Sequence, residues 1–165
     1  MRTIYFCRHA KSSWDDPRMR DFDRPLNDRG LHNAPMMARK FSEKNEPVDL
    51  LITSPAVRAL STARYFAREL GMPEESLVKE PMIYEASVAT LLKLINVLPS
   101  DQGSVLFFGH NPGFTEIIEY LSGDAIGNLP TCGMARIDVE VDDWMAVSRG
   151  NGRLVWRDHP KRHEC

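Results

Sequence analysis

The chain has 165 residues, 42% hydrophobic and 27% charged, values typical of one globular domain (residues 1–165) with a core large enough to fold alone. Its formal net charge of −2 argues against general attraction to nucleic acid or an acidic membrane, so an anion site has to be built locally. The apolar run at residues 4–7 is too short for a signal-peptide core, and no run approaches the roughly 20 residues of a membrane span. Three scattered cysteines (Cys7, Cys132 and Cys165) suggest no disulfide framework, so we expect a cytoplasmic protein.

The first half of the chain predicts two strands and two helices. Residues 3–7 and 50–53 are short apolar runs typical of buried strands. Residues 27–44 have a helical pattern, which we expect Pro35 to kink or restart. A second helix is expected to begin with Ser54 as N-cap and Pro55 at the first helical position, and to end at Gly71.

The second half continues the alternation of helices and strands. A helix is expected at residues 87–98, a buried strand at 105–108, and a helix that begins at Asn111-Pro112 and ends at Gly123. Residues 134–141 alternate between apolar and polar, which predicts an edge strand with one solvent-facing side, and residues 154–156 predict a last short strand. The pattern predicts an α/β fold with a mostly parallel sheet.

Cationic and imidazole side chains follow three of the predicted strands. Arg8 and His9 come directly after the first strand, and Arg58 lies one turn into the helix that follows the second. His110 comes directly after the strand at residues 105–108. Because parallel α/β sheets bind ligands at the carboxyl ends of their strands, we expect these groups to meet there. Two arginines and two histidines without a matching acidic cluster favour a phosphate site over a metal site.

His9 is the candidate nucleophile of this site. A histidine can attack phosphorus only when it is neutral, and nearby positive charge lowers its pKa. We expect Arg8, Arg58 and a protonated His110 to keep His9 neutral. A backbone carbonyl on one ring nitrogen would fix the tautomer and leave the other nitrogen free.

These residues stand in motifs with a family resemblance. Arg8-His9-Ala10 resembles the Arg-His-Gly motif of the histidine phosphatase superfamily, whose fold is phosphoglycerate mutase-like. The segments around Arg58 and His110 resemble the family's second arginine and second histidine motifs, and Pro25-Leu26-Asn27 its proline-leucine-threonine stretch. The resemblance implies a three-layer sandwich with a mixed, mostly parallel sheet and helices on both faces.

Within the superfamily the chain looks most like the short SixA-type phosphohistidine phosphatases, through Arg8-His9-Ala10-Lys11-Ser12 and Gly109-His110-Asn111-Pro112-Gly113. Mutases of the family carry asparagine at the position of Asp15, and mutases and many small-molecule phosphatases have a long insertion for which 165 residues leave no room. Both departures count against mutase activity.

The resemblance implies a two-step phosphoryl transfer without metal or cofactor. His9 would become phosphorylated and then be hydrolysed by water, while Arg8, Arg58 and His110 hold the phosphoryl oxygens. Lys11, Ser12 and Asn111 are further substrate-binding candidates, and Glu85 is the candidate general acid. A phosphohistidine substrate needs little such acid, because imidazole is a better leaving group than an alkoxide.

Several alternatives remain open at this point. The substrate could be a phosphohistidine protein or a small phosphorylated metabolite, and the chain could also be a silent phosphate-binding module. Glu85 could be an ordinary acid near a helix N-terminus. The charged loop at residues 14–24 could be a solvated loop or could line the entrance to the site. The tail at residues 159–165 matches no standard zinc pattern, so no metal is expected there.

Overall fold

The computed structural model describes residues 1–164 and contains a six-stranded sheet with the strand order β3-β2-β4-β1-β5-β6. The strands are β1 (Arg2–Arg8), β2 (Leu50–Thr53), β3 (Val78–Lys79), β4 (Ser104–Gly109), β5 (Met134–Val139) and β6 (Gly152–Asp158). The first four strands in this order pair in parallel, whereas β5 pairs antiparallel with both β1 and β6. The sheet is therefore mixed and mostly parallel, as predicted.

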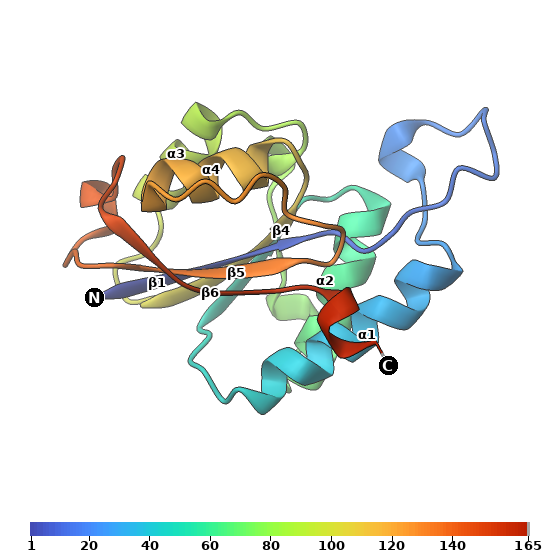
Figure 1. Cartoon of the computed structure of the whole chain (residues 1–165), viewed down its shortest axis with the longest axis horizontal. Coiled ribbons are helices and arrows are strands. Elements are labelled where there is room, and N and C mark those ends of the chain that lie inside the picture. The colour runs from blue at the N-terminus through green and yellow to red at the C-terminus, as the bar shows by residue number, and fades with distance from the viewer. Residues whose placement is uncertain (165) are drawn as a thin grey trace.

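Two helices cover each face of the sheet (Figure 1). Helices α1 (Asp28–Glu43) and α2 (Val57–Glu69) pack on one face, around Phe41, Phe66 and Phe108. Helices α3 (Val88–Asn96) and α4 (Gly113–Ser122) pack on the other face. The predicted three-layer α/β sandwich is confirmed.

The prediction that residues 134–141 form an edge strand is wrong. Strand β5 lies between β1 and β6 and is almost fully buried, and the run predicted at residues 154–156 is the centre of the seven-residue edge strand β6. The polar face of β5 is tolerated inside the sheet because its charges are paired. Asp138 is 5% exposed and accepts hydrogen bonds from Arg136 Nε at 2.9 Å and from Thr3 Oγ1 at 3.0 Å.

The helices differ from the prediction mainly at their starts. Helix α1 continues through Pro35, so the predicted restart does not occur. Helix α2 begins at Val57 and not at Pro55, because the Ser54 hydroxyl caps a preceding turn by accepting from the Ala56 amide at 3.2 Å. Helix α4 begins at Gly113 with Pro112, and not Asn111, as its N-cap residue, while the Asn111 side chain accepts from the Thr115 amide of the first turn at 3.1 Å.

The helices of residues 1–164 include none that is both long enough and apolar enough to cross a membrane.

Candidate active site

Two histidines meet where β1 and β4 end side by side. The parallel register pairs Arg8 with Gly109, and the His9 amide continues the ladder by donating to the Gly109 carbonyl at 3.0 Å. His9 and His110 therefore leave adjacent strands at the same edge of the sheet, with ring centroids 5.3 Å apart. The expectation that these distant segments converge is confirmed.

Contacts to both ring nitrogens indicate the tautomer of His9. Nδ1 lies 2.7 Å from the carbonyl oxygen of Ala10, and because a carbonyl can only accept, Nδ1 carries the proton. Nε2 accepts a hydrogen bond from Arg58 Nε at 3.4 Å. The imidazole is therefore neutral, and the lone pair of Nε2 points toward the arginine.

Burial is the main reason why His9 is neutral. Its pKa is lowered to about 3, mainly by desolvation and then by the nearby His110, Arg58 and Arg8, while the hydrogen bond to the Ala10 carbonyl acts in the opposite direction. The sequence had suggested that neighbouring charge dominates. It had also suggested a protonated His110, but burial and then Arg58 lower the pKa of His110 to about 3 as well.

Within the described part of the chain, one ring nitrogen of His110 has a hydrogen-bond partner and the other has none. Its Nε2 lies 2.8 Å from the Ser54 hydroxyl, which also accepts from the Ala56 amide. Its Nδ1 is buried and lacks a hydrogen-bond partner within residues 1–164. Buried polar atoms are rarely left unpaired, so Nδ1 suits an anionic ligand, to which it donates when it carries the ring proton.

Arg58 is held by an aspartate that the sequence analysis left unassigned. In the first turn of α2, Arg58 donates from Nη1 to the Asp21 carbonyl at 2.7 Å and from Nη2 to Asp21 Oδ2 at 3.0 Å. The same carboxylate accepts from the Tyr84 hydroxyl at 2.6 Å. These hydrogen bonds lower the pKa of Asp21, with that from Tyr84 the largest cause, so this carboxylate is ionised at neutral pH.

Arg24 adds a third arginine that the motifs did not single out. Its side chain is buried against the ring of Trp14 at 3.4 Å and donates to the Ser12 hydroxyl. Its Nη1 lies 3.7 Å from Asp21 Oδ1, while Nε and Nη1 have no hydrogen-bond partner among residues 1–164. Part of the charged loop therefore lines the site. The only signal in the sequence was its place directly before Pro25-Leu26.

Arg8 is the last residue of β1, directly before His9. Its Nη1 donates to the Leu129 carbonyl at 3.1 Å, and its buried Nε lacks a partner in the described part of the chain. Burial, and then the charge of Arg58, lower the pKa of Arg8. Arg8 and Arg58 thus lie near enough to repel each other, which an anion between them would relieve.

The remaining candidates have mixed placements. Lys11 is exposed next to Arg8, and Ser12 is buried under Arg24. Asn111 uses its amide inside the chain, donating to the Leu129 carbonyl at 2.9 Å and accepting from Thr115. Glu85 is exposed in the turn before α3, with a φ of 57°. Substrate binding by Lys11, Ser12 and Asn111 and acid catalysis by Glu85 stay predictions.

The described residues 1–164 contain no group of three or more His, Cys, Asp or Glu side chains placed to hold a metal ion. In the tail, His163 Nε2 lies 2.8 Å from Asp158 Oδ2, and Cys165 is outside the described residues.

Comparison with known proteins identifies the family. Residues 4–92 match the histidine phosphatase superfamily (branch 1), and the chain belongs to this superfamily. Over nearly its full length it resembles structures of SixA, the phosphohistidine phosphatase, with the phosphoglycerate mutase-like fold.

The individual relatives cover most of the chain. A structure from Agrobacterium tumefaciens named after the phosphohistidine phosphatase SixA is 28% identical with a TM-score of 0.81, covering 96% of this chain and 98% of that one. The protein histidine phosphatase SixA complexed with tungstate has a TM-score of 0.80 at 23% identity, covering 98% and 99%, which shows the shared fold. An uncharacterized chloroplastic protein of Arabidopsis thaliana is 29% identical over 94% of this chain and 75% of its own length.

Proposed function

We propose that this protein is a phosphatase that removes phosphoryl groups from phosphorylated histidines of proteins through a covalent phosphohistidine on His9. The observation that carries the proposal is the state of the His9 ring. Its Nδ1 proton is held by the Ala10 carbonyl and its Nε2 lone pair faces the Arg58 guanidinium. A nucleophile is thus aimed at a cationic cluster that suits a phosphoryl group.

The first step is attack of His9 Nε2 on phosphorus, which forms the Nε2–P bond, breaks the bond between phosphorus and the imidazole nitrogen of the substrate, and releases that imidazole. A phosphoryl group between Arg8, Arg58 and His110 replaces Asp21 as the partner of Arg58 and accepts from the unpaired Nδ1–H of His110. Each cation about 4 Å from a phosphoryl charge contributes roughly 4 kcal/mol of attraction before desolvation, at an effective dielectric constant near 20. Charge in the transition state lies on the equatorial oxygens, so these donors stabilise it. Water then hydrolyses the phosphohistidine and restores the neutral imidazole.

The charge state of Asp21 favours a phosphohistidine substrate. A phosphoester releases an alkoxide, which needs a proton from a general acid. The carboxylate in contact with the cluster is Asp21, and its lowered pKa makes it a poor proton donor at neutral pH. A phosphohistidine releases imidazole, which can leave without such help. The full-length resemblance to SixA structures supports the same substrate class.

A phosphomonoesterase acting on a small metabolite is the second candidate. It is favoured by the position of Glu85, which adjoins Tyr84 in sequence, while the Tyr84 ring lies 5.4 Å from the His110 ring. In that case Glu85 is the general acid.

We also propose that the protein is cytoplasmic, as expected from the scattered cysteines.

The test is a substrate panel with a phosphohistidine peptide, phosphoramidate and a sugar phosphate. Wild type is expected to hydrolyse the first two, with kcat/KM reduced at least about 10³-fold in His9→Ala. Glu85→Gln is expected to leave these rates within about twofold but to lower any phosphoester turnover by about 10²-fold or more. Preference for the sugar phosphate would favour the second candidate. No turnover, with phosphopeptide binding unchanged in His9→Ala, would indicate a phosphate-binding module.

A further inference from the structure

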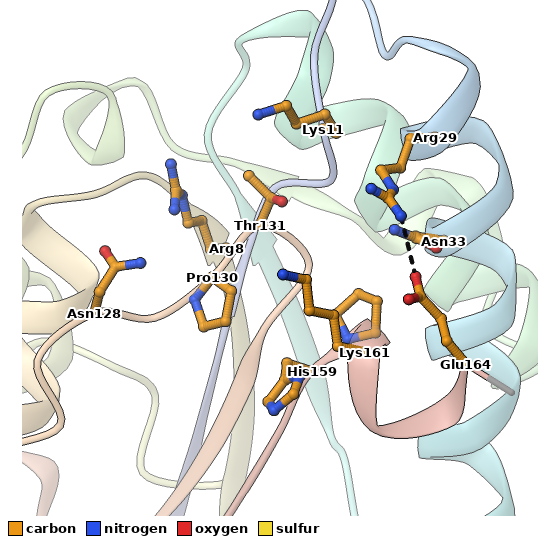
Figure 2. A pocket seen from close by; sticks show the side chains of 11 residues that line it. Arg8, Lys11, Arg29, Asn33, Asn128, Pro130, Thr131, His159, Lys161 and Glu164 are labelled. Carbon is orange, nitrogen blue, oxygen red and sulfur yellow. Dashed lines mark hydrogen bonds and ion pairs between the residues drawn. The ribbon is translucent and has the colours of Figure 1, made fainter.

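A cavity of about 440 Å³ adjoins Arg8 and is lined by four cationic side chains from three segments of the chain (Figure 2). Arg8 comes from the end of β1, and Lys11 from the loop that follows. Arg29 comes from the first turn of α1, and Lys161 from the 3-10 turn Pro160–His163. This accumulation of positive charge stands out in a chain whose formal net charge is −2.

Among residues 1–164, the positive charge of this cavity is only partly compensated. Glu164 is the acidic residue of its lining, and it pairs with Arg29 at 3.4 Å. Both side chains of this pair are about half exposed, where ion pairs contribute little. Arg8 donates to the Leu129 carbonyl, a neutral group, and its buried Nε has no partner within residues 1–164. The lining of this cavity therefore attracts anions.

We propose that this cavity is a subsite for Asp and Glu side chains of the protein substrate, next to its phosphohistidine. The inference rests on the proposed function, and it specifies the substrate as a histidine within an acidic surface. Arg8 connects the two sites, since it is the last residue of β1, directly before His9, and also lines the cavity.

Exposure of the cations favours a protein over a small metabolite. Lys11, Arg29 and Lys161 are all exposed, so they form an open rim around the cavity. Sites for small molecules bury most of the ligand surface. An open cationic rim instead complements carboxylates carried on the surface of a larger partner, where it increases the association rate and selects the partner.

The test uses two phosphohistidine peptides of equal length, with glutamates or glutamines flanking the histidine. Wild type is expected to hydrolyse the glutamate peptide with a kcat/KM about three- to tenfold higher, an advantage that shrinks with added salt. Lys161→Glu and, more weakly, Arg29→Gln should remove this preference. Both variants should hydrolyse phosphoramidate, which has no flanking group, at the wild-type rate.

Lys93→Glu is the matched control, because it makes the same charge change at an exposed position of α3, on the opposite face of the sheet. It should keep the preference. The subsite would be overturned if Lys161→Glu preferred the glutamate peptide as strongly as wild type does, or if wild type hydrolysed the two peptides with equal kcat/KM. So would a preference limited to sugar bisphosphates over monophosphates, which would assign the cavity to a metabolite.

A binding measurement separates this inference from the proposed function. The same two peptides, carrying a non-hydrolysable phosphotriazole analogue of phosphohistidine, are titrated against His9→Ala by fluorescence anisotropy. Tighter binding of the glutamate peptide, lost in His9→Ala/Lys161→Glu, supports the subsite even where wild type fails to hydrolyse phosphohistidine. Equal binding of both peptides overturns it even where hydrolysis is observed.

Discussion

Asp21 neutralises the arginine that a substrate would need. Arg58 donates from Nη2 to the carboxylate of Asp21, and the Tyr84 hydroxyl holds that carboxylate in place. A phosphoryl group has to displace this contact, and it is repelled by the same negative charge. Asp21 thus holds Arg58 in place at the expense of anion affinity.

Asp21→Asn is therefore expected to tighten anion binding. The substitution keeps a hydrogen-bond acceptor for Arg58 but removes the competing charge, so the inhibition constant of tungstate should fall roughly three- to tenfold. Asp23→Asn is the control, because this carboxylate of the same turn pairs with Arg20 on the surface, at 2.9 Å. An unchanged or higher inhibition constant in Asp21→Asn would contradict this role.

The two site histidines make stability dependent on pH. His9 and His110 have pKa values of about 3 in the folded protein, and the ordinary value of about 6.5 returns on unfolding. The unfolded chain therefore binds more protons below pH 6.5. The free energy of unfolding should fall by up to about 1.4 kcal/mol per pH unit per histidine between pH 6.5 and 3, with no such loss above pH 6.5.

Urea unfolding at several pH values measures this slope. His9→Asn should reduce the slope by the equivalent of one proton relative to wild type. Equal slopes in the two proteins would show that His9 titrates normally in the folded state.

At the residue scale, the sequence predicted the groups that stand in motifs but not those that depend on packing. Arg8, His9, Arg58 and His110 could be found because each follows a strand or opens a helix. The roles of Arg24 and Asp21 could not, because an arginine and an aspartate in a charged loop look the same in sequence whether exposed or buried. Which of them faces the site depends on the ring of Trp14 and the hydroxyl of Tyr84.

At the scale of elements, the first turn of α1 supports the loop that orients His9. Gly30 lies in this turn, and the side chain of Asn27 caps it by accepting from the Gly30 amide at 2.9 Å. A Cβ atom at Gly30 would collide with the carbonyl oxygen of Lys11. That backbone directly follows Ala10, whose carbonyl holds the His9 ring.

Gly30→Ala should consequently affect both stability and catalysis. Because the collision is with backbone, either α1 or the loop has to shift, at a cost of about 1–3 kcal/mol in the free energy of unfolding. The kcat for phosphoramidate should fall as well, because the loop orients His9. Arg39→Ala, at an exposed position of the same helix, should change stability by no more than about 0.5 kcal/mol. If Gly30→Ala kept the wild-type stability and kcat, the first turn of α1 would not support the loop that orients His9.

Helices and buried strands were predicted well because their signals are local, such as apolar periodicity, Asn27 before α1 and Gly123 after α4. The error at β5 has a non-local cause. Its alternating pattern looked like an edge strand, because the sequence does not show that Asp138 pairs with Arg136 or that β6 adds outside it. The predicted start of α2 at Pro55 was wrong for a similar reason. Ser54 contacts His110, a residue distant in sequence, and the sequence does not show this contact.

At the scale of the whole molecule, one sheet separates two apolar layers. Trp144 is buried in the layer with α3 and α4, and Trp156 packs in the layer with α1 and α2, whereas Trp14 is 73% exposed. Because both layers share every central strand, we expect residues 1–165 to unfold as a single domain.

Tryptophan fluorescence tests this expectation in a Trp14→Phe background, where Trp144 and Trp156 report on the two layers. The urea midpoint from fluorescence should coincide with the midpoint from far-ultraviolet circular dichroism. Two separate midpoints would indicate that the layers unfold independently.

The central claim is that Nε2 of His9 becomes phosphorylated during turnover. Rapid quenching of the wild type with a phosphohistidine peptide should trap an acid-labile, base-stable phosphoryl group, mapped by mass spectrometry to His9 and missing in His9→Ala. Steady turnover with no trapped phosphoenzyme, or a phosphoryl group mapped to another residue, would contradict the account.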